Sequence, residues 1–370
     1  MTKHNADNER IKRKYFSFLK EAKRLSVQSV DGVASAISRY ESYTKHKDFR
    51  MFNVEQVSAF KKHLAEQKGQ RSGENLSKAT LHATFNHLKQ FFQWLSRETG
   101  YKTRIQYSDA EYFNLSKNDT HIATAQREQR WPTLEQLKRA LDMMPAHTDI
   151  ARRNRALFAF TILTGARDSA IASMKLKHID LQAGYVFQDA RDVKTKFRKT
   201  FTTFFFPVGD EIHEIVAEWV RYLREELLWG NDDPLFPATR IAHGQTLQFE
   251  AAGLERNHWS TTSPIRTIFR QAFDHAGLPY FNPHSIRNTL VQLGLKVCKT
   301  HEQLKAWSQN IGHESVLTTL LNYGEVAFQR QGEIIKGLST PLPENSLASV
   351  SELAKALAQE MRNNGMDVRI

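Results

Sequence analysis

Apolar residues recur at steps of three and four along the first hundred positions, the spacing that gathers them on one face of an α-helix. The clearest run comprises Leu81, Phe85, Leu88, Phe92 and Leu95. Ser77 can cap the start of this helix, and Gly100 can stop it. Similar runs occupy three earlier stretches, residues 11–18, 33–40 and 54–64. Four helices in so short a segment predict a small all-α bundle over residues 1–105.

The helical period is lost over residues 106–130, where Ser, Asn, Asp, Thr and Gln dominate. We therefore expect an interdomain linker there. Helical patterning resumes with Thr133 as a candidate N-cap. A second apolar helix, over residues 151–164, should end at Gly165. A second domain is thus expected over residues 131–340.

The period of the pattern changes between residues 179 and 207. Three short β-prone runs stand there between polar turns: Tyr185–Phe187, Val193-Lys194 and Thr200–Phe206. They predict a small antiparallel sheet with Lys194 at its turn. Residues 229–260 are rich in Gly and Pro and predict loops.

Helical patterns return in four later segments, residues 211–228, 263–276, 284–298 and 301–309. Gly312-His313 is expected to open a further helix toward Tyr323. The tail, residues 341–370, carries an amphipathic stripe over about 351–361. The predicted fold class is mainly α with a small antiparallel β-sheet, with an N-terminal four-helix domain and an α+β second domain.

Composition narrows the class of protein. The chain has 370 residues, of which 40% are hydrophobic and 25% charged, which is ordinary for a globular protein of two domains. It contains no apolar run of about 18 residues, so we expect no membrane span. The N-terminus lacks an apolar signal region, and the single cysteine, Cys298, fits a reducing compartment. These features favour a cytoplasmic protein.

The charge balance points to a polyanionic partner. Lys and Arg number 52 against 40 Asp and Glu, a formal net charge of +12. Residues 1–50 hold 12 of these cations and only six acidic residues. Neutralising phosphates with such cations releases condensed counterions, which favours binding to nucleic acid. A merely basic surface would give the same count.

Two cationic segments could bind an anion. Arg167 follows Gly165, where a sharp turn can aim its planar fork at two phosphate oxygens. His284 and Arg287 follow an Asn-Pro pair that can start a helix, and their spacing puts both on one face near its positive end. Either segment alone could instead be a surface ion pair or an ordinary capped helix.

A lysine and a tyrosine complete the candidate chemistry. Lys194 at a turn could donate a proton, although its neighbours Lys196, Arg198 and Lys199 leave the assignment open. Tyr323 lies ten residues after His313. A tyrosine needs nearby cations or a base to become a nucleophile, because its unperturbed pKa is near 10. Taken alone, Tyr323 would be interpreted as a half-buried packing residue.

In order along the chain these residues are Arg167, Lys194, His284, Arg287, His313 and Tyr323. The set resembles the signature of the tyrosine recombinase (phage integrase) family of site-specific DNA recombinases. The local contexts Thr-Gly-x-Arg, Lys-Thr, Pro-His-x-x-Arg and Gly-His also match. The resemblance covers about residues 10–335. It implies a core-type DNA-binding domain at 1–105 and a catalytic domain at 131–340.

The resemblance implies that Tyr323 attacks a scissile phosphate, forms a 3′-phosphotyrosine link and releases a 5′-hydroxyl. Arg167 and Arg287 would stabilise the charge on the non-bridging oxygens, as metal ions do in many nucleases. Lys194 would protonate the leaving oxygen. The remaining two residues are histidines: His284 would assist proton transfer, and His313 would hydrogen-bond the phosphate.

No cofactor is expected. The sequence has no Gly-x-x-x-x-Gly-Lys phosphate loop, and its histidines lack the spacing of a zinc site. The covalent link would conserve the energy of the phosphodiester, so resealing would need no ATP. We therefore expect chemistry that is independent of metal and of ATP.

The expected partner is double-stranded DNA carrying specific recombination sites, held between the two domains. The resemblance implies a homotetramer in the synaptic complex, with the helix at 351–361 a candidate for exchange between protomers. Accessory DNA-bending proteins are a further class of partner. A bacterial or phage-encoded, nucleoid-associated protein with no membrane partner is expected. No arm-binding domain is expected before the bundle, which starts near residue 10.

Three positions depart from the family pattern. Ala170 stands where a glutamate is common, Asn288 stands where many members have a second histidine, and the interval from His313 to Tyr323 is one residue longer than usual. Two rival functions share the signature. A type IB topoisomerase would relax supercoils without exchanging partners, and a catalytically silent relative would bind DNA alone.

Overall fold

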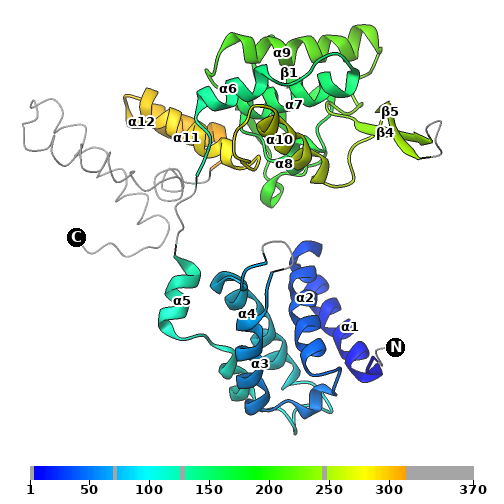
Figure 1. The fold of residues 1–370 in the computed structure, drawn as a ribbon, viewed down its shortest axis with the longest axis vertical. Coiled ribbons are helices and arrows are strands. Elements are labelled where there is room, and N and C mark those ends of the chain that lie inside the picture. The colour runs from blue at the N-terminus through cyan, green and yellow to red at the C-terminus, as the bar shows by residue number, and fades with distance from the viewer. Residues whose placement is uncertain (1–3, 70–72, 126–129, 244–247, 314–370) are drawn as a thin grey trace, which may run out of the picture. The chain divides into compact units, whose positions relative to one another are not determined.

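The computed structural model describes residues 4–69, 73–125, 130–243 and 248–313 (Figure 1). The chain forms two compact units, Met1–Arg127 and Glu128–Ile370. Each is a separate body with its own hydrophobic core. The predicted tail helix, and Tyr323 with it, lies outside the described residues.

The first unit is built on four helices, as the periodicity predicted: α1 (Ala6–Glu21), α2 (Val27–Tyr43), α3 (Val54–Glu66) and α4 (Lys78–Leu95). Each begins at a side-chain cap, and these caps are Asn5, Ser26, Asn53 and Ser77. Such caps satisfy backbone N–H groups that have no partner within the helix. The last helix ends at Leu95, one turn before the predicted stop at Gly100.

Aromatic side chains dominate the core of this unit. Phe92 is fully buried and its ring lies 4.0 Å from that of Phe52 and 5.2 Å from that of Tyr40. Its ring is also 5.8 Å from that of Phe113. Ring pairs at these separations add attraction beyond the area they bury. The heptad-like stripe of α4 therefore faces an aromatic centre to which every helix of the bundle contributes.

The segment expected to be a linker, residues 106–130, differs from that expectation. A 3-10 helix spans Tyr107–Phe113, and helix α5 spans Lys117–Thr124. Ala110 and Phe113 are buried in the core of the first unit. Two apolar positions three residues apart suffice to dock this short 3-10 helix, and so short a pattern does not stand out among polar neighbours.

The second unit contains seven helices among its described residues: α6 (Leu134–Asp142), α7 (Asp149–Thr164), α8 (Asp168–Ile171), α9 (Asp210–Arg221), α10 (Ser263–His275), α11 (Ser285–Val297) and α12 (His301–Ile311). Thr133 caps α6 in a full capping box, as predicted. α7 is its central helix, because the residues from Ala156 to Thr164 are buried on every side.

A three-stranded antiparallel sheet follows, with β1 (Ile179–Asp180), β2 (Tyr185–Gln188) and β3 (Phe201–Phe204) side by side in chain order. Val186 pairs with Ile179 on one side and with Thr203 on the other. The predicted sheet is therefore confirmed, but Val193-Lys194 is not a strand. Val193 is buried in the long β2–β3 connection instead.

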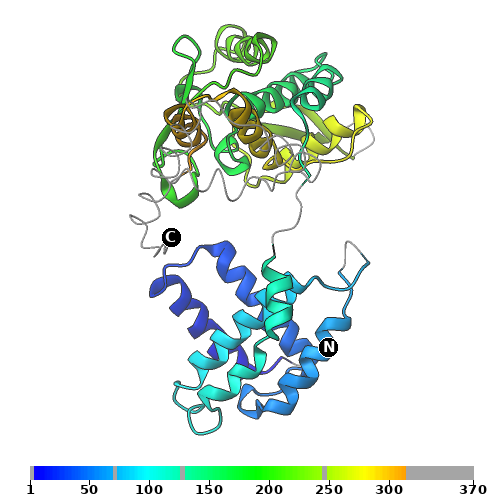
Figure 2. The ribbon, with the colours of Figure 1, turned by 90° about the vertical axis from the view of Figure 1, so that its left-hand side faces the viewer.

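The prediction of loops over residues 229–260 is confirmed at both ends of the segment but was wrong in its middle. A hairpin of β4 (Ala238–His243) and β5 (Phe249–Glu255) projects there from the unit (Figure 1; Figure 2 is the same ribbon turned by 90° about the vertical axis). Both of its faces are largely exposed, so its sequence shows no alternation of apolar and polar residues. Arg153 on α7 anchors its base, donating to the Pro237 carbonyl at 2.8 Å and to Thr239 at 3.0 Å.

None of the described helices is long and apolar enough to span a bilayer.

Candidate functional site

Arg167 lies just after the end of the buried helix α7. Gly165 closes that helix in the left-handed conformation, with φ 60°. A β-carbon there would lie 2.8 Å from a methyl group of Leu290, so both the backbone angle and the packing require glycine. Arg167 follows in extended backbone, half-buried, at the N-terminus of α8. The rigid core of the unit thus fixes the origin of this side chain.

Arg287 ties three segments of the second unit together. Its side chain is 2% exposed and projects from the first turn of α11. One guanidinium nitrogen donates to the Gly165 carbonyl at 2.6 Å, and the other donates to the Ile311 carbonyl at 2.8 Å. The end of α7 and the end of α12 are 122 and 24 residues away in sequence. Arg287 therefore sets the spacing between Arg167 and the segment that carries His313.

The end of α12 differs from the prediction. Gly312 closes this helix with φ 83° instead of opening another one, and His313 directly follows. An added β-carbon at Gly312 would lie 2.7 Å from the ring of Phe201, the first residue of β3. The glycine lets the helix end close to the sheet. His313 is 6% exposed.

The two histidines experience the field of both arginines. Burial, then Arg287 and Arg167, and then His284 and Lys196 lower the pKa of His313 to about 3. His284 stands at the N-cap position of α11 and is exposed. Its pKa is also lowered, first by partial loss of solvation and then by the charges of Arg287 and Arg167. Both rings are therefore neutral at pH 7. The four predicted residues lie together in one positive field.

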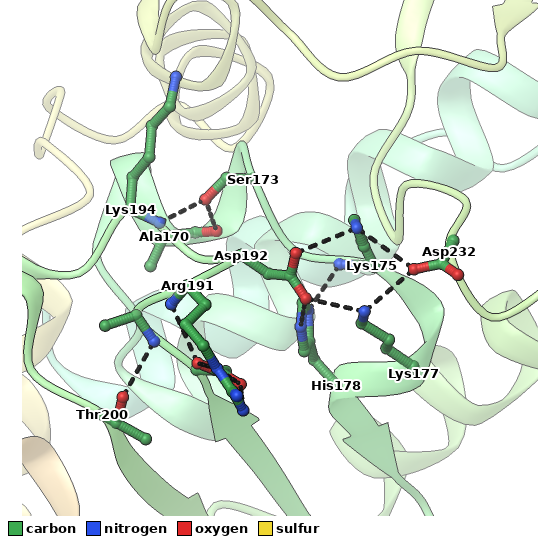
Figure 3. Close-up of polar contacts among 12 residues, drawn as sticks. Ala170, Ser173, Lys175, Lys177, His178, Arg191, Asp192, Lys194, Thr200 and Asp232 are labelled. Atoms are coloured by element: carbon green, nitrogen blue, oxygen red, sulfur yellow. Dashed lines mark hydrogen bonds and ion pairs between the residues drawn. The ribbon is translucent and has the colours of Figure 1, made fainter.

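The lysine assignment is less simple than the sequence indicates. Lys194 lies in the β2–β3 connection, as predicted, and its backbone N–H donates to the Ser173 hydroxyl at 2.8 Å (Figure 3). Its charge acts on His258. Lys196, two residues later, is the lysine whose charge acts on His284 and His313. Of the two lysines, Lys196 is the one whose charge reaches the site histidines.

The sequence analysis did not predict an ionic cluster that lies next to the β2–β3 connection. Asp192 accepts from Lys175 at 3.1 Å and from Lys177 at 2.8 Å, and its carboxylate lies 3.6 Å from His178 (Figure 3). Asp232 bridges the same two lysines. Hydrogen bonds from Lys177 and Lys175 lower the pKa of Asp192, so it stays ionised. Only the alternating Lys-x-Lys at 175–177 hints at it in the sequence.

Two of the departures from the family pattern fall in buried positions. Ala170 is 1% exposed and packs in the core of the second unit, where a glutamate would have to be desolvated. Asn288 is 3% exposed, directly after Arg287. Tyr323 and the His313-to-Tyr323 interval lie outside the described residues.

The arrangement is suited to holding an anion. Two guanidinium groups and two neutral imidazoles come from the ends of three helices, and neutral imidazole can both donate and accept a hydrogen bond. Among the residues that the structure describes, no three His, Cys, Asp or Glu side chains converge as metal ligands would. The site thus offers positive charge and hydrogen-bond donors to a tetrahedral oxyanion.

Comparison with known proteins agrees with this geometry. The phage integrase family model matches residues 130–330. The tyrosine recombinase XerC of Halalkalibacterium halodurans is 24% identical over 251 residues, covering 66% of this chain and 71% of that protein. The XerC of Natranaerobius thermophilus is 21% identical over 324 residues, covering 86% and 95%. The tyrosine recombinase XerD of Oceanobacillus iheyensis is 21% identical over 317 residues, covering 82% and 90%.

Solved structures share the fold. A lambda integrase dimer bound to a COC′ core site aligns with a TM-score of 0.58 at 13% identity, covering 86% of this chain and 96% of that one. The XerH site-specific recombinase bound to a palindromic difH substrate aligns with a TM-score of 0.55 at 17% identity, covering 89% and 85%. Since the family model spans more than half of the sequence, this chain belongs to the phage integrase family and is a tyrosine-type site-specific recombinase.

Proposed function

We propose that this recombinase cleaves and rejoins double-stranded DNA through a 3′-phosphotyrosine intermediate formed by Tyr323, without metal or ATP. One observation carries the proposal. Burial, and then the charges of Arg287 and Arg167, lower the pKa of His313 to about 3, and the same causes lower the pKa of His284. The part of each shift that comes from the two arginines reflects a positive field at both rings, and such a field attracts an anion.

The scissile phosphate would bind with its non-bridging oxygens toward Arg167 and Arg287. Negative charge on these oxygens grows in the pentacoordinate transition state, and fixed donors stabilise it most when they need no reorganisation. Arg287 is well suited to this role, since two of its donors already bond the Gly165 and Ile311 carbonyls and hold its guanidinium in place. His313 would donate a further hydrogen bond to the phosphate.

In the cleavage step the phenolic oxygen of Tyr323 forms a bond to phosphorus, and the bond from phosphorus to the 5′ oxygen breaks. His284, neutral at pH 7, would take the phenol proton. Lys194 would give a proton to the departing 5′ oxygen, which leaves as a hydroxyl. Attack by a 5′-hydroxyl from another strand reverses every transfer and reseals the DNA, so no nucleotide cofactor is consumed.

The first unit would bind the duplex beside the catalytic unit. Exposed cations, among them Arg13, Lys20 and Lys62, stand on its helices and could contact phosphates. Specific recombination sites, a homotetramer at synapsis and accessory DNA-bending proteins are part of the same proposal. The lambda integrase and XerH structures contain bound DNA, and another lambda integrase structure is a tetramer on a Holliday junction, which supports the DNA and oligomer parts.

The decisive experiment traps the covalent intermediate. A nicked suicide substrate, which loses its short 5′-hydroxyl fragment after cleavage, should accumulate a protein–DNA adduct with the full-length protein in EDTA. Tyr323→Phe should abolish the adduct, because its ring has no nucleophilic oxygen, and should retain DNA binding in a gel-shift assay. Tyr280→Phe is the matched control, since this tyrosine is exposed in the same unit.

Three outcomes would contradict the proposal in different ways. An adduct that persists in Tyr323→Phe would remove the assignment of the nucleophile. DNA binding without any adduct in the unaltered protein would indicate a catalytically silent relative. Relaxation of supercoils on DNA of any sequence, without strand exchange, would indicate a type IB topoisomerase.

A further inference from the structure

Both backbone groups of Lys194 are bound by serines from the segment that follows Arg167. The Lys194 N–H donates to the Ser173 hydroxyl at 2.8 Å, and the Ser169 hydroxyl donates to the Lys194 carbonyl at 3.1 Å. Ser173 in turn donates to the Ser169 and Ala170 carbonyls, at 3.0 and 3.1 Å. Figure 3 shows the Lys194–Ser173–Ala170 part of this chain. A single loop residue is thus fixed through both its donor and its acceptor.

The residues just before Lys194 are held as well. Val193 is 2% exposed in the core of the second unit. Asp192 forms ion pairs with Lys175 and Lys177 (Figure 3). Hydrogen bonds to Asp192 and Asp232 raise the pKa of Lys177 to about 12. Three consecutive positions, Asp192 to Lys194, are therefore fixed by a side chain, by burial and by the backbone respectively.

Lys196 differs in this respect. It begins a short 3-10 turn in which Phe197 and Arg198 have φ values of 59° and 53°, a conformation that costs energy for residues other than glycine. The Phe197 ring is 79% exposed, and the Lys196 ammonium lies over it at 4.9 Å. Lys196 therefore adds charge to the site from an outward turn, whereas the backbone of Lys194 is fixed to the chain that carries Arg167.

We propose that Ser169 and Ser173 are positioning residues, which hold the Lys194 backbone at a set distance from Arg167 so that Lys194, and not Lys196, protonates the leaving 5′ oxygen. The inference rests on the proposed function and adds the supporting pair to it. A general acid must lie within hydrogen-bond reach of the oxygen while the arginine holds the same phosphate, so the two residues need a common support.

The test compares two leaving groups on otherwise identical suicide substrates. In ordinary DNA the 5′ oxygen must receive a proton as it departs. In DNA with a bridging 5′ sulfur at the scissile position, the leaving thiolate needs no proton, because a thiol has a pKa of about 8.5. A defect in delivering the proton therefore disappears on the sulfur substrate, whereas a defect in folding, DNA binding or arginine placement remains on both.

For ordinary DNA we expect Lys194→Ala to slow single-turnover cleavage by about 10²–10⁴-fold, the range typical of a lost general acid. Ser169→Ala and Ser173→Ala should each slow it by roughly tenfold, and the double variant by about 10²-fold, because a loosened lysine still reaches the oxygen part of the time. All four variants should cleave the sulfur substrate within about threefold of the unaltered protein. Ser169→Thr, which keeps the hydroxyl, should restore the rate on ordinary DNA.

The control is Ser35→Ala in the first unit, where the serine hydroxyl also donates to a backbone carbonyl, at 2.9 Å from the Asp31 oxygen. It should not change either rate. Serine variants that stay slow on the sulfur substrate would overturn the proposal, and so would sulfur rescue of Lys196→Ala but not of Lys194→Ala. Failure of the proposed function is a separate result, since the unaltered protein would then form no Tyr323 adduct with either substrate.

Discussion

Buried charged side chains have different kinds of partner in the two units. In the first unit, Glu41 is 2% exposed and its carboxylate accepts from the Lys12 ammonium at 2.6 Å and from the fully buried Asn8 amide at 3.2 Å. Asn8 also donates to the Lys47 carbonyl and accepts from the Phe49 N–H. Opposite charges and complementary hydrogen bonds thus meet inside the unit, where they join α1, α2 and the turn after α2.

In the second unit, the buried Arg287 donates to two neutral carbonyls, and its charge together with that of Arg167 still lowers the pKa of two histidines. This contrast indicates the role of each group of buried charges. Charge that is cancelled locally contributes to the fold, whereas charge that continues to act on its neighbours is available to a ligand.

Arg287→Lys should reduce strand cleavage by on the order of 10²–10³-fold, as the loss of a transition-state donor does elsewhere. A lysine keeps the charge but cannot donate to both carbonyls and to a phosphate in one plane. The rate should be measured by single-turnover cleavage at a temperature where the variant is fully folded.

The matched control is Arg153→Lys. Arg153 is equally buried in the same unit, at 3% exposed, but it holds the β4–β5 hairpin and lies 4.8 Å from the Trp259 ring. This variant should lose stability and cleave within about threefold of the normal rate once folded. If both variants lost cleavage equally, the distinction between a structural and a functional buried arginine in this unit would be wrong.

Lys12→Met should destabilise the first unit by about 2–3 kcal/mol, because it leaves the Glu41 carboxylate buried without its cation. Hydrogen exchange followed by mass spectrometry on the full-length protein can measure each unit separately. Exchange should accelerate in α1 and α2 and stay unchanged in the second unit. The double variant Lys12→Met/Glu41→Gln should recover part of the loss, and no recovery would show that the ion pair is not the cause.

Acid should weaken the second unit through His313. Its pKa is about 3 in the folded protein, against about 6.5 in an unfolded chain. Between these values the unfolded chain binds a proton that the folded protein does not, so stability falls as the pH drops from about 6.5 toward 3. His313→Gln should flatten this dependence by up to one proton, measured by urea unfolding at pH 7, 6 and 5.

His275→Gln, at an exposed position of α10, is the control for that measurement and should leave the slope unchanged. A slope that is the same in His313→Gln as in the unaltered protein would mean that the field at His313 is weaker than the geometry implies. Bound DNA should oppose the effect, since a phosphate near the ring favours its protonated form.

Much of the fold was open to prediction because its signals are local. The three- and four-residue spacing of Leu81, Phe85 and Leu88 on α4 can be recognised from neighbours within two helical turns. The capping residues Ser77 and Thr133 lie beside the N–H groups they bind. The docked turn at 107–113 and the β4–β5 hairpin were missed, since their stability comes from a core residue or from Arg153 in a distant part of the chain.

The sequence alone named the residues to which the family resemblance assigns the chemistry. Their identities and order name Arg167, Lys194, His284, Arg287, His313 and Tyr323, although the part played by each stays a prediction. Only the tertiary structure decided which groups share a field, and that Gly312 closes α12. It also decided that Ser169 and Ser173 bind Lys194. The difference lies in the sequence separation over which each signal acts. Helix propensity and residue spacing act over a few residues, whereas these contacts join positions up to 122 residues apart. Only the packed core brings such positions within hydrogen-bond distance.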